Sequence, residues 1–67
     1  MNISVNDKSK AVAGSTTLAG LLHELGLAER RGVAVAVNDA VAPRSTWLLH
    51  ALAEGDRVLV IHATQGG

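Results

Sequence analysis

The chain has 67 residues, no cysteine and a formal net charge of zero, with six basic and six acidic side chains. This length allows one domain at most, and the absence of cysteine excludes disulfides, thiolate metal sites and a cysteine nucleophile. The balanced charge argues against a nucleic-acid binder or a polybasic membrane anchor, and the single aromatic residue argues against RNA or DNA binding by base stacking.

Nothing in the sequence indicates export or membrane insertion. No stretch approaches the roughly 20 apolar residues that span a bilayer. The first residues lack the basic and apolar regions of a signal peptide. We therefore expect a cytoplasmic protein and no membrane partner, and we expect Gly67 to be the natural C-terminus.

The N-terminal segment has the pattern of a β-hairpin. Residues 1–5 alternate between apolar and polar side chains, which is typical of a strand with one buried face. Residues 6–9 read Asn-Asp-Lys-Ser, and Asn and Asp favour turns because they tolerate left-handed backbone angles. Residues 10–12 then return as a short second strand.

A helix follows, with clear start and stop signals. Thr17 is the expected N-cap, because its hydroxyl can accept a hydrogen bond from the first turn. Gly26 is placed where a glycine commonly ends a helix. Four leucines follow the cap at helical spacing and form one apolar stripe: Leu18, Leu21, Leu22 and Leu25.

The second half of the chain has two strong strand signals. Residues 33–37 read Val-Ala-Val-Ala-Val, and residues 57–62 form a final apolar strand. Pro43 limits residues 40–41 to a short edge segment, and residues 45–49 fit one helical turn.

The predicted element order is β-β-α-β-β, an α+β arrangement. One helix covers one face of a small mixed sheet, with the first and last strands pairing in parallel at its centre. Residues 1–62 form the domain, and residues 63–67 are expected to be a flexible tail because they have no periodicity and end in two glycines.

The polar residues do not suggest a catalytic or metal site. His23, His50 and His62 come from different predicted elements and lack metal-ligand spacing or a triad arrangement. The glycines do not form a phosphate-binding loop, so no bound cofactor is expected. The sequence therefore predicts no catalytic residue.

The terminal Gly66-Gly67 admits two interpretations. It can be a frayed end. Alternatively, a chain without side chains can enter a narrow channel in extended form and deliver only the Gly67 carboxylate. A carboxylate is a poor electrophile, so ATP-dependent adenylation would be needed before a thiolate or amine could attack it.

The last strand is apolar on both faces, whereas one helix covers only one face of a sheet. Val58 and Val60 lie on one side, and Leu59 and Ile61 on the other. We expect Leu59 and Ile61 to be exposed as a partner-docking surface. The alternative is that residues 40–49, with Trp47, fold over this pair.

Several motifs together resemble the ThiS family of ubiquitin-like sulfur-carrier proteins of thiamine biosynthesis. The resemblance covers essentially the whole chain. It rests on the β-β-α-β-β order and on these segments: Thr17-Leu18 at the start of the helix, Val37-Asn38, Val41-Ala42-Pro43-Arg44 with Trp47, Glu54-Gly55-Asp56-Arg57-Val58 and Gly66-Gly67.

The resemblance implies a β-grasp fold and a carrier that is not an enzyme. An E1-like adenylating enzyme would use ATP to adenylate Gly67. Sulfur derived from cysteine through a desulfurase persulfide would then give a C-terminal thiocarboxylate, which would donate sulfur to thiazole synthase. Gly66 and Gln65 would form the segment that enters the partner. Gln65 departs from the small or apolar residue that is usual at this position in such proteins.

Three alternatives stay open. The small subunit of molybdopterin synthase shares this fold and carrier chemistry, but such chains are usually longer and richer in Phe, whereas this chain has no Phe. A ubiquitin-like modifier would form covalent adducts through Gly67. A β-grasp interaction module would not need its diglycine.

Overall fold

The computed structural model describes residues 1–62. The predicted tail, residues 63–67, lies outside the described residues, and so do Gln65, Gly66 and Gly67. The helices and strands are β1 (Asn2–Val5), β2 (Lys8–Ala11), α1 (Leu18–Glu24), β3 (Val33–Val37), β4 (Ala40–Val41), the 3-10 helix η1 (Arg44–Thr46) and β5 (Arg57–His62).

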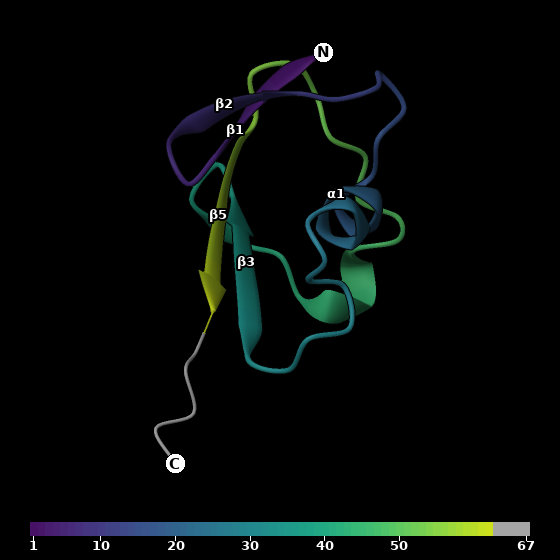
Figure 1. Ribbon diagram of the computed structural model, residues 1–67, viewed down its shortest axis with the longest axis vertical. Coiled ribbons are helices and arrows are strands. Elements are labelled where there is room, and N and C mark those ends of the chain that lie inside the picture. Colours follow the sequence, from purple (N-terminus) through teal and green to yellow (C-terminus); the bar gives the residue numbers. More distant parts are fainter. Residues whose placement is uncertain (63–67) are drawn as a thin grey trace.

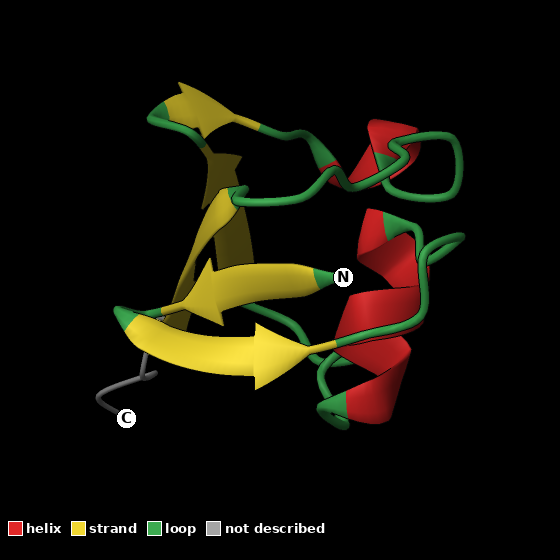
Figure 2. Cartoon of the chain, turned by 90° about the horizontal axis from the view of Figure 1, so that it is seen from above, coloured by secondary structure: helices red, strands yellow, loops and turns green. Residues whose placement is uncertain are grey.

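The strands form one mixed sheet in the order β2-β1-β5-β3-β4. β5 lies at the centre, parallel to β1 and antiparallel to β3, which confirms the predicted parallel pairing of the first and last strands. Figures 1 and 2 show that α1 and η1 cover one face of this sheet and leave the other face without a helix. This is the β-grasp arrangement expected from the resemblance.

Residues 40–41 form the short edge segment that was predicted, and they add a fifth strand to the sheet, because Val41 pairs with Ala36 and Ala40 with Val37. One detail differs from the prediction. The second strand begins at residue 8 rather than residue 10, because the first hairpin turn needs only two residues. The turn therefore consists of Asn6 and Asp7 alone, whereas the sequence suggested a turn of four residues.

The two hairpins use the same kind of turn. Asn6 and Asp7 have φ values of 50° and 69°, and Asn38 and Asp39 have φ values of 51° and 71°. Two successive residues with positive φ are typical of a type I′ turn, whose twist matches that of the flanking strands. Asn and Asp tolerate this backbone region better than most residues do.

The leucine stripe of α1 forms the centre of the core. Leu18, Leu21 and Leu22 are fully buried. They pack with four side chains from the inner face of the sheet: Ile3, Val35, Val37 and Val58. The predicted helix start is confirmed, because Thr17 Oγ1 accepts a hydrogen bond from the Gly20 amide at 3.1 Å. The chain leaves the helix through Gly26, whose φ is +76°.

The segment between β4 and β5 packs on the helix side of the sheet. Trp47 is 4% exposed, and its indole Nε1 donates to the Ala42 carbonyl at 2.8 Å. The Ala19 amide donates to the Trp47 carbonyl at 3.0 Å, which ties this segment to α1. The alternative in which residues 40–49 cover Leu59 and Ile61 is therefore wrong.

Arg44 holds a second connection against this segment. Its guanidinium lies 4.6 Å from the centre of the Trp47 ring. It also donates to the carbonyls of Ala28 at 2.7 Å and Arg30 at 2.6 Å. The Pro-Arg-x-x-Trp motif thus serves the fold, because it joins the α1–β3 connection to η1.

Candidate functional site

The helix-free face of the sheet carries the candidate docking residues. Along β5, Val58 is 2% exposed and faces the core, whereas Leu59 is 48% and Ile61 55% exposed. The structure thus places Leu59 and Ile61 together at the surface, as the alternation of the strand predicts. Their role in docking stays a prediction.

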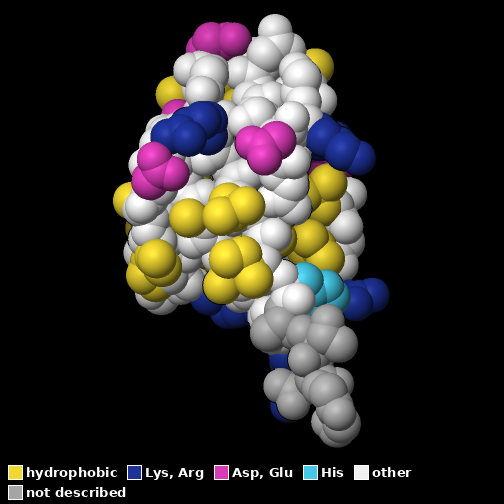
Figure 3. Space-filling model, turned by 90° about the vertical axis from the view of Figure 1, so that its left-hand side faces the viewer, with side chains coloured by type: hydrophobic (Ala, Val, Ile, Leu, Met, Phe, Trp, Pro, Cys, Tyr) yellow, Lys and Arg dark blue, Asp and Glu magenta, His cyan; other side chains and the backbone are white. Residues whose placement is uncertain are grey.

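The exposed apolar surface is wider than these two residues. The register of β5, β3 and β4 puts further side chains beside them, because directly paired residues share a face. We call the outer patch the set Ala34, Ala36, Val41, Leu59 and Ile61. Val41 is 78% exposed. Figure 3 shows hydrophobic side chains gathered on this face.

Only Leu59 and Ile61 of the outer patch were identified from the sequence, and Ala34, Ala36 and Val41 were missed. Of these three, Val41 is the large hydrophobic side chain that is exposed. Its segment is only two residues long, so alternation alone could not assign it to a face. The signal that could have found it is the type I′ turn, which fixes the register of the hairpin.

A polar rim borders the outer patch at the start of β5. Arg57 donates to Asp39 Oδ2 at 2.7 Å, and both side chains are more than half exposed. A shallow hollow of about 400 Å³ lies here between the two hairpin turns, with Asp7, Asp39, Arg57 and Leu59 among its lining residues. An ion pair this exposed adds little to stability, so its main effect is on the charge distribution around the patch.

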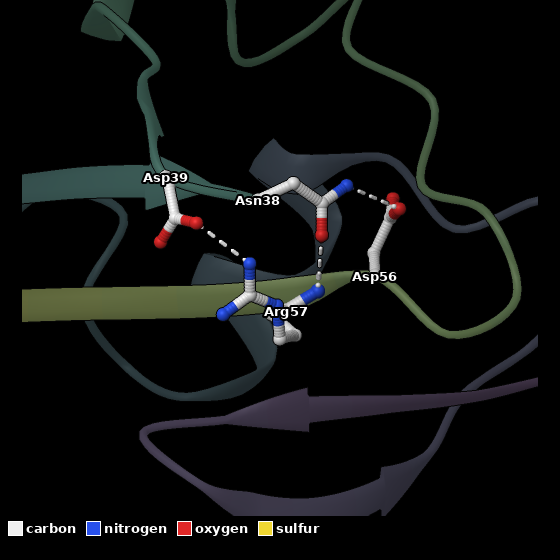
Figure 4. A network of polar contacts seen from close by, with 4 residues as sticks. All are labelled: Asn38, Asp39, Asp56 and Arg57. Atoms are coloured by element: carbon white, nitrogen blue, oxygen red, sulfur yellow. Dashed lines mark hydrogen bonds and ion pairs between the residues drawn. The ribbon is translucent and has the colours of Figure 1, made fainter.

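Asn38 links the hairpin turn to the start of β5 (Figure 4). Its Oδ1 accepts from the Arg57 backbone amide at 2.8 Å, and its Nδ2 donates to Asp56 Oδ1 at 2.9 Å. Asp56 Oδ2 in turn accepts from the Ala53 amide at 2.8 Å. These bonds fix where the central strand begins.

Replacement of Asn38 should separate the contribution of its side-chain hydrogen bonds from the cost of its positive φ. We expect Asn38→Ala to lower the free energy of unfolding by about 1–3 kcal/mol, because it removes both side-chain bonds and forces alanine into positive φ. Asn38→Gly, which tolerates that φ, should lose about half as much. Urea unfolding of both variants measures this difference, and equal losses would show that the backbone conformation costs nothing here.

Asn6 plays the equivalent part on the other side of β5. Its Oδ1 accepts from the Val60 amide at 2.8 Å, and its own amide donates to the Val58 carbonyl at 2.9 Å. Both turn asparagines therefore hold the central strand. Both turns have the sequence Val-Asn-Asp, at residues 5–7 and 37–39.

The histidines are dispersed in the structure. His23 is exposed on α1, and His62 is exposed at the end of β5, whereas His50 is half-buried in the connection before β5. Within residues 1–62, no three His, Cys, Asp or Glu side chains are grouped as metal ligands would be. None of the helices that the structure describes has the length and apolar character of a membrane span.

Two residues of the outer patch lie on the strand that precedes the diglycine. Leu59 and Ile61 belong to β5, which ends at His62, and only five residues of sequence follow. Gly67 is therefore at most about 18 Å of extended chain from the end of β5. The exposed pair Leu59 and Ile61 and the diglycine are therefore separated by only a few residues of sequence.

Comparisons with known proteins find relatives over the full length of the chain. The model of the ThiS family matches residues 3–67. The chain is 33% identical to the sulfur carrier protein ThiS of Escherichia coli over 67 residues, which is the full length of both. It superimposes on the crystal structure of the thiamine biosynthesis protein ThiS from Geobacter metallireducens with a TM-score of 0.84, 32% identity and full coverage of both chains.

One relative is much longer. The chain is 40% identical over its full length to a part of a thiazole synthase from Magnetococcus marinus, and it covers 20% of that protein. The family match spans nearly the whole chain, and the relative from Escherichia coli matches it from end to end. On these grounds the chain belongs to the ThiS family.

Proposed function

We propose that this chain is a sulfur carrier of thiamine biosynthesis whose C-terminal Gly67 is converted to a thiocarboxylate. The observation that carries the proposal is the end-to-end similarity to the sulfur carrier protein from Escherichia coli, together with the Gly66-Gly67 sequence that follows β5. The chain acts as a co-substrate in this scheme, and the catalytic groups belong to its partners.

The chemistry takes place at one carboxylate. An oxygen of Gly67 attacks the α-phosphorus of ATP in the active site of an E1-like adenylating enzyme, which forms the acyl-adenylate and releases pyrophosphate. The terminal sulfur of a persulfide, derived from cysteine by a desulfurase, then displaces AMP. A thiol cleaves the resulting acyl disulfide, and the thiocarboxylate remains on Gly67.

The fold supports this role by separating docking from delivery. The outer patch gives a partner an apolar surface, and the two residues before Gly67, Gln65 and Gly66, form the segment that enters the partner's active site. Gly66 lacks a Cβ, so it can pass through a narrow channel in the partner. ATP is bound by the adenylating enzyme and not by this chain.

The sulfur acceptor that we propose is thiazole synthase. The chain matches a fifth of a thiazole synthase from Magnetococcus marinus at 40% identity, so in that protein a similar segment shares one polypeptide with a thiazole synthase. This observation favours the thiazole branch over molybdopterin synthase, whose small subunit has the same carrier chemistry.

The acceptor can be tested with the thiocarboxylated protein. It is mixed either with thiazole synthase and its other substrates or with the large subunit of molybdopterin synthase and its precursor. We expect the thiocarboxylate to be consumed, as measured by intact mass, only in the first mixture. Consumption only in the second mixture would reassign the carrier to molybdopterin synthesis.

The docking role of the outer patch gives a separate prediction. Leu59→Asp or Ile61→Asp should raise the Kd for the adenylating enzyme at least tenfold, because a carboxylate would be buried in an apolar interface. The melting temperature should change little, since both side chains are about half exposed. Calorimetric titration and circular dichroism measure the two quantities.

The matched control for this prediction is Leu49→Asp, because Leu49 is 90% exposed and lies outside the outer patch. It should leave both the Kd and the melting temperature unchanged. A melting temperature lowered by more than 10 °C in the Leu59 variant would show that this side chain belongs to the core, and the docking assignment would then be withdrawn.

A further inference from the structure

The central strand is paired along its full length on one side only. β3 pairs with β5 from Val37↔Val58 to Val33↔His62. On the opposite side, β1 pairs only through Ser4↔Arg57 and Val5↔Val58. Figure 1 shows β1 and β2 beside the upper part of β5, with no strand beside its lower part on that side.

The direction of the backbone groups can be assigned from the bonds of Asn6. The Val58 carbonyl accepts from the Asn6 amide at 2.9 Å, and the Val60 amide donates to Asn6 Oδ1 at 2.8 Å. Residues two apart on a strand direct their backbone groups to the same side. The Val60 carbonyl and the His62 amide therefore also point away from β3.

Neither of these two groups has a hydrogen-bond partner within the part of the chain that the structure describes. Asn6 ends the pairing on this side, because its side chain occupies the Val60 amide and the chain then turns away into β2. We call this region, the Val60 carbonyl and the His62 amide, the open edge of β5. An open strand edge is a template for another strand.

The short segment after β5 limits how far from the open edge the partner's active site can lie. Five residues follow His62, and fully extended they span at most about 18 Å. An enzyme that adenylates Gly67 must therefore bring its active-site entrance close to the end of β5. The open edge is then removed from water, and buried backbone groups without a partner are strongly disfavoured.

We infer that the open edge of β5 pairs with an extended strand of the adenylating enzyme, which adds that strand to the sheet of the carrier. This inference rests on the proposed function, since it supplies the binding mode for the enzyme that acts on Gly67. The open edge adjoins Leu59 and Ile61 of the outer patch, so one partner surface covers both. Main-chain bonds at an exposed edge are a common way to bind a strand.

The pairing at the open edge also fixes where Gly67 lies in the active site of the enzyme. A strand ladder allows only discrete positions, and a shift along β5 would move Gly67 away from the α-phosphate by about 3.3 Å for each residue. Docking through the outer patch alone would leave this register loosely fixed. The open edge therefore serves as the positioning element for the reacting carboxylate.

The experiment compares His62→Pro with His62→Ala in the full chain and the purified adenylating enzyme. Proline removes the amide hydrogen that faces the open edge, and it is tolerated where no ladder bond to a neighbouring strand is lost. Alanine removes only the side chain, which is exposed. We expect His62→Pro to raise both the Kd and the KM about tenfold, and His62→Ala to change each less than twofold.

A second measurement does not depend on the folding of the proline variant. Hydrogen exchange of the His62 amide in the wild-type chain should slow at least tenfold when the enzyme binds. Unchanged exchange in the saturated complex, or equal Kd values for the two variants, would overturn the inference. If either result is found but the wild-type chain is still adenylated, the proposed function stands and only the strand-pairing inference is overturned. If the wild-type chain is not adenylated at all, both are overturned.

Discussion

Deletion of Gly66 and Gly67 is expected to abolish sulfur transfer while leaving the domain folded. The group that is adenylated and then receives sulfur from the persulfide in the proposed chemistry is the carboxylate of Gly67, and the shortened chain would present the carboxylate of Gln65 instead. That carboxylate is two residues, or about 7 Å, nearer the domain and cannot reach the same position. Thiazole formation in the reconstituted system should fall to the background rate.

The stability of the shortened chain is the control for this prediction. The buried core runs from Ile3 to Val58, so the deletion removes none of its side chains. We expect the melting temperature to stay within about 2 °C of the full-length value, because the deletion removes no core packing. Retained thiazole formation would contradict the carrier function and would favour an interaction module that does not use its diglycine.

Leu22→Ala is expected to have the largest effect on stability. Leu22 is fully buried at the centre of the leucine stripe, and truncation leaves a cavity between α1 and the sheet. Such a change costs about 2–5 kcal/mol. A single core in a chain this short rarely supplies more than about 3–5 kcal/mol of stability, so much of the variant should be unfolded at 25 °C.

The matched control is Leu48→Ala, since Leu48 is 77% exposed and makes no part of the core. Circular dichroism during thermal unfolding should show a melting temperature at least about 10 °C lower for Leu22→Ala and little change for Leu48→Ala. Similar melting temperatures for both variants would mean that α1 is held by something other than its leucine stripe.

The parts of the fold that depend on local patterns could be predicted from the sequence. Thr17, the leucine spacing and Gly26 fixed the helix, because capping and amphipathic periodicity are properties of neighbouring residues. The alternation in residues 57–62 correctly separated Val58, which is buried, from Leu59, which is exposed. The parallel pairing of the first and last strands also followed from the element order.

The parts that depend on distant residues could not be predicted in this way. The Arg44 guanidinium meets the carbonyls of Ala28 and Arg30, more than ten residues away, and no local pattern encodes that contact. The same holds for Asn6, whose side chain bonds to Val60 across 54 positions. Such contacts arise only when the sheet brings the two segments together.

The candidate site shows the same division. Leu59 and Ile61 were identified from alternation, whereas Val41 joins the outer patch only through the pairing of β4 with β3. The open edge of β5 depends on where β1 stops, which is set by the position of the type I′ turn at Asn6 and Asp7. The role of Gly67 was inferred from chemistry and from the family resemblance.

The most direct test of the carrier function is the intact mass of the full chain after incubation with host lysate, ATP and cysteine. A parallel sample uses the chain without Gly67, and the lysate is first shown to convert a known carrier. We expect a mass gain equal to the exchange of one oxygen for sulfur in the full chain and no such gain in the control. An unchanged mass of the full chain in that lysate would contradict the proposal that Gly67 carries sulfur.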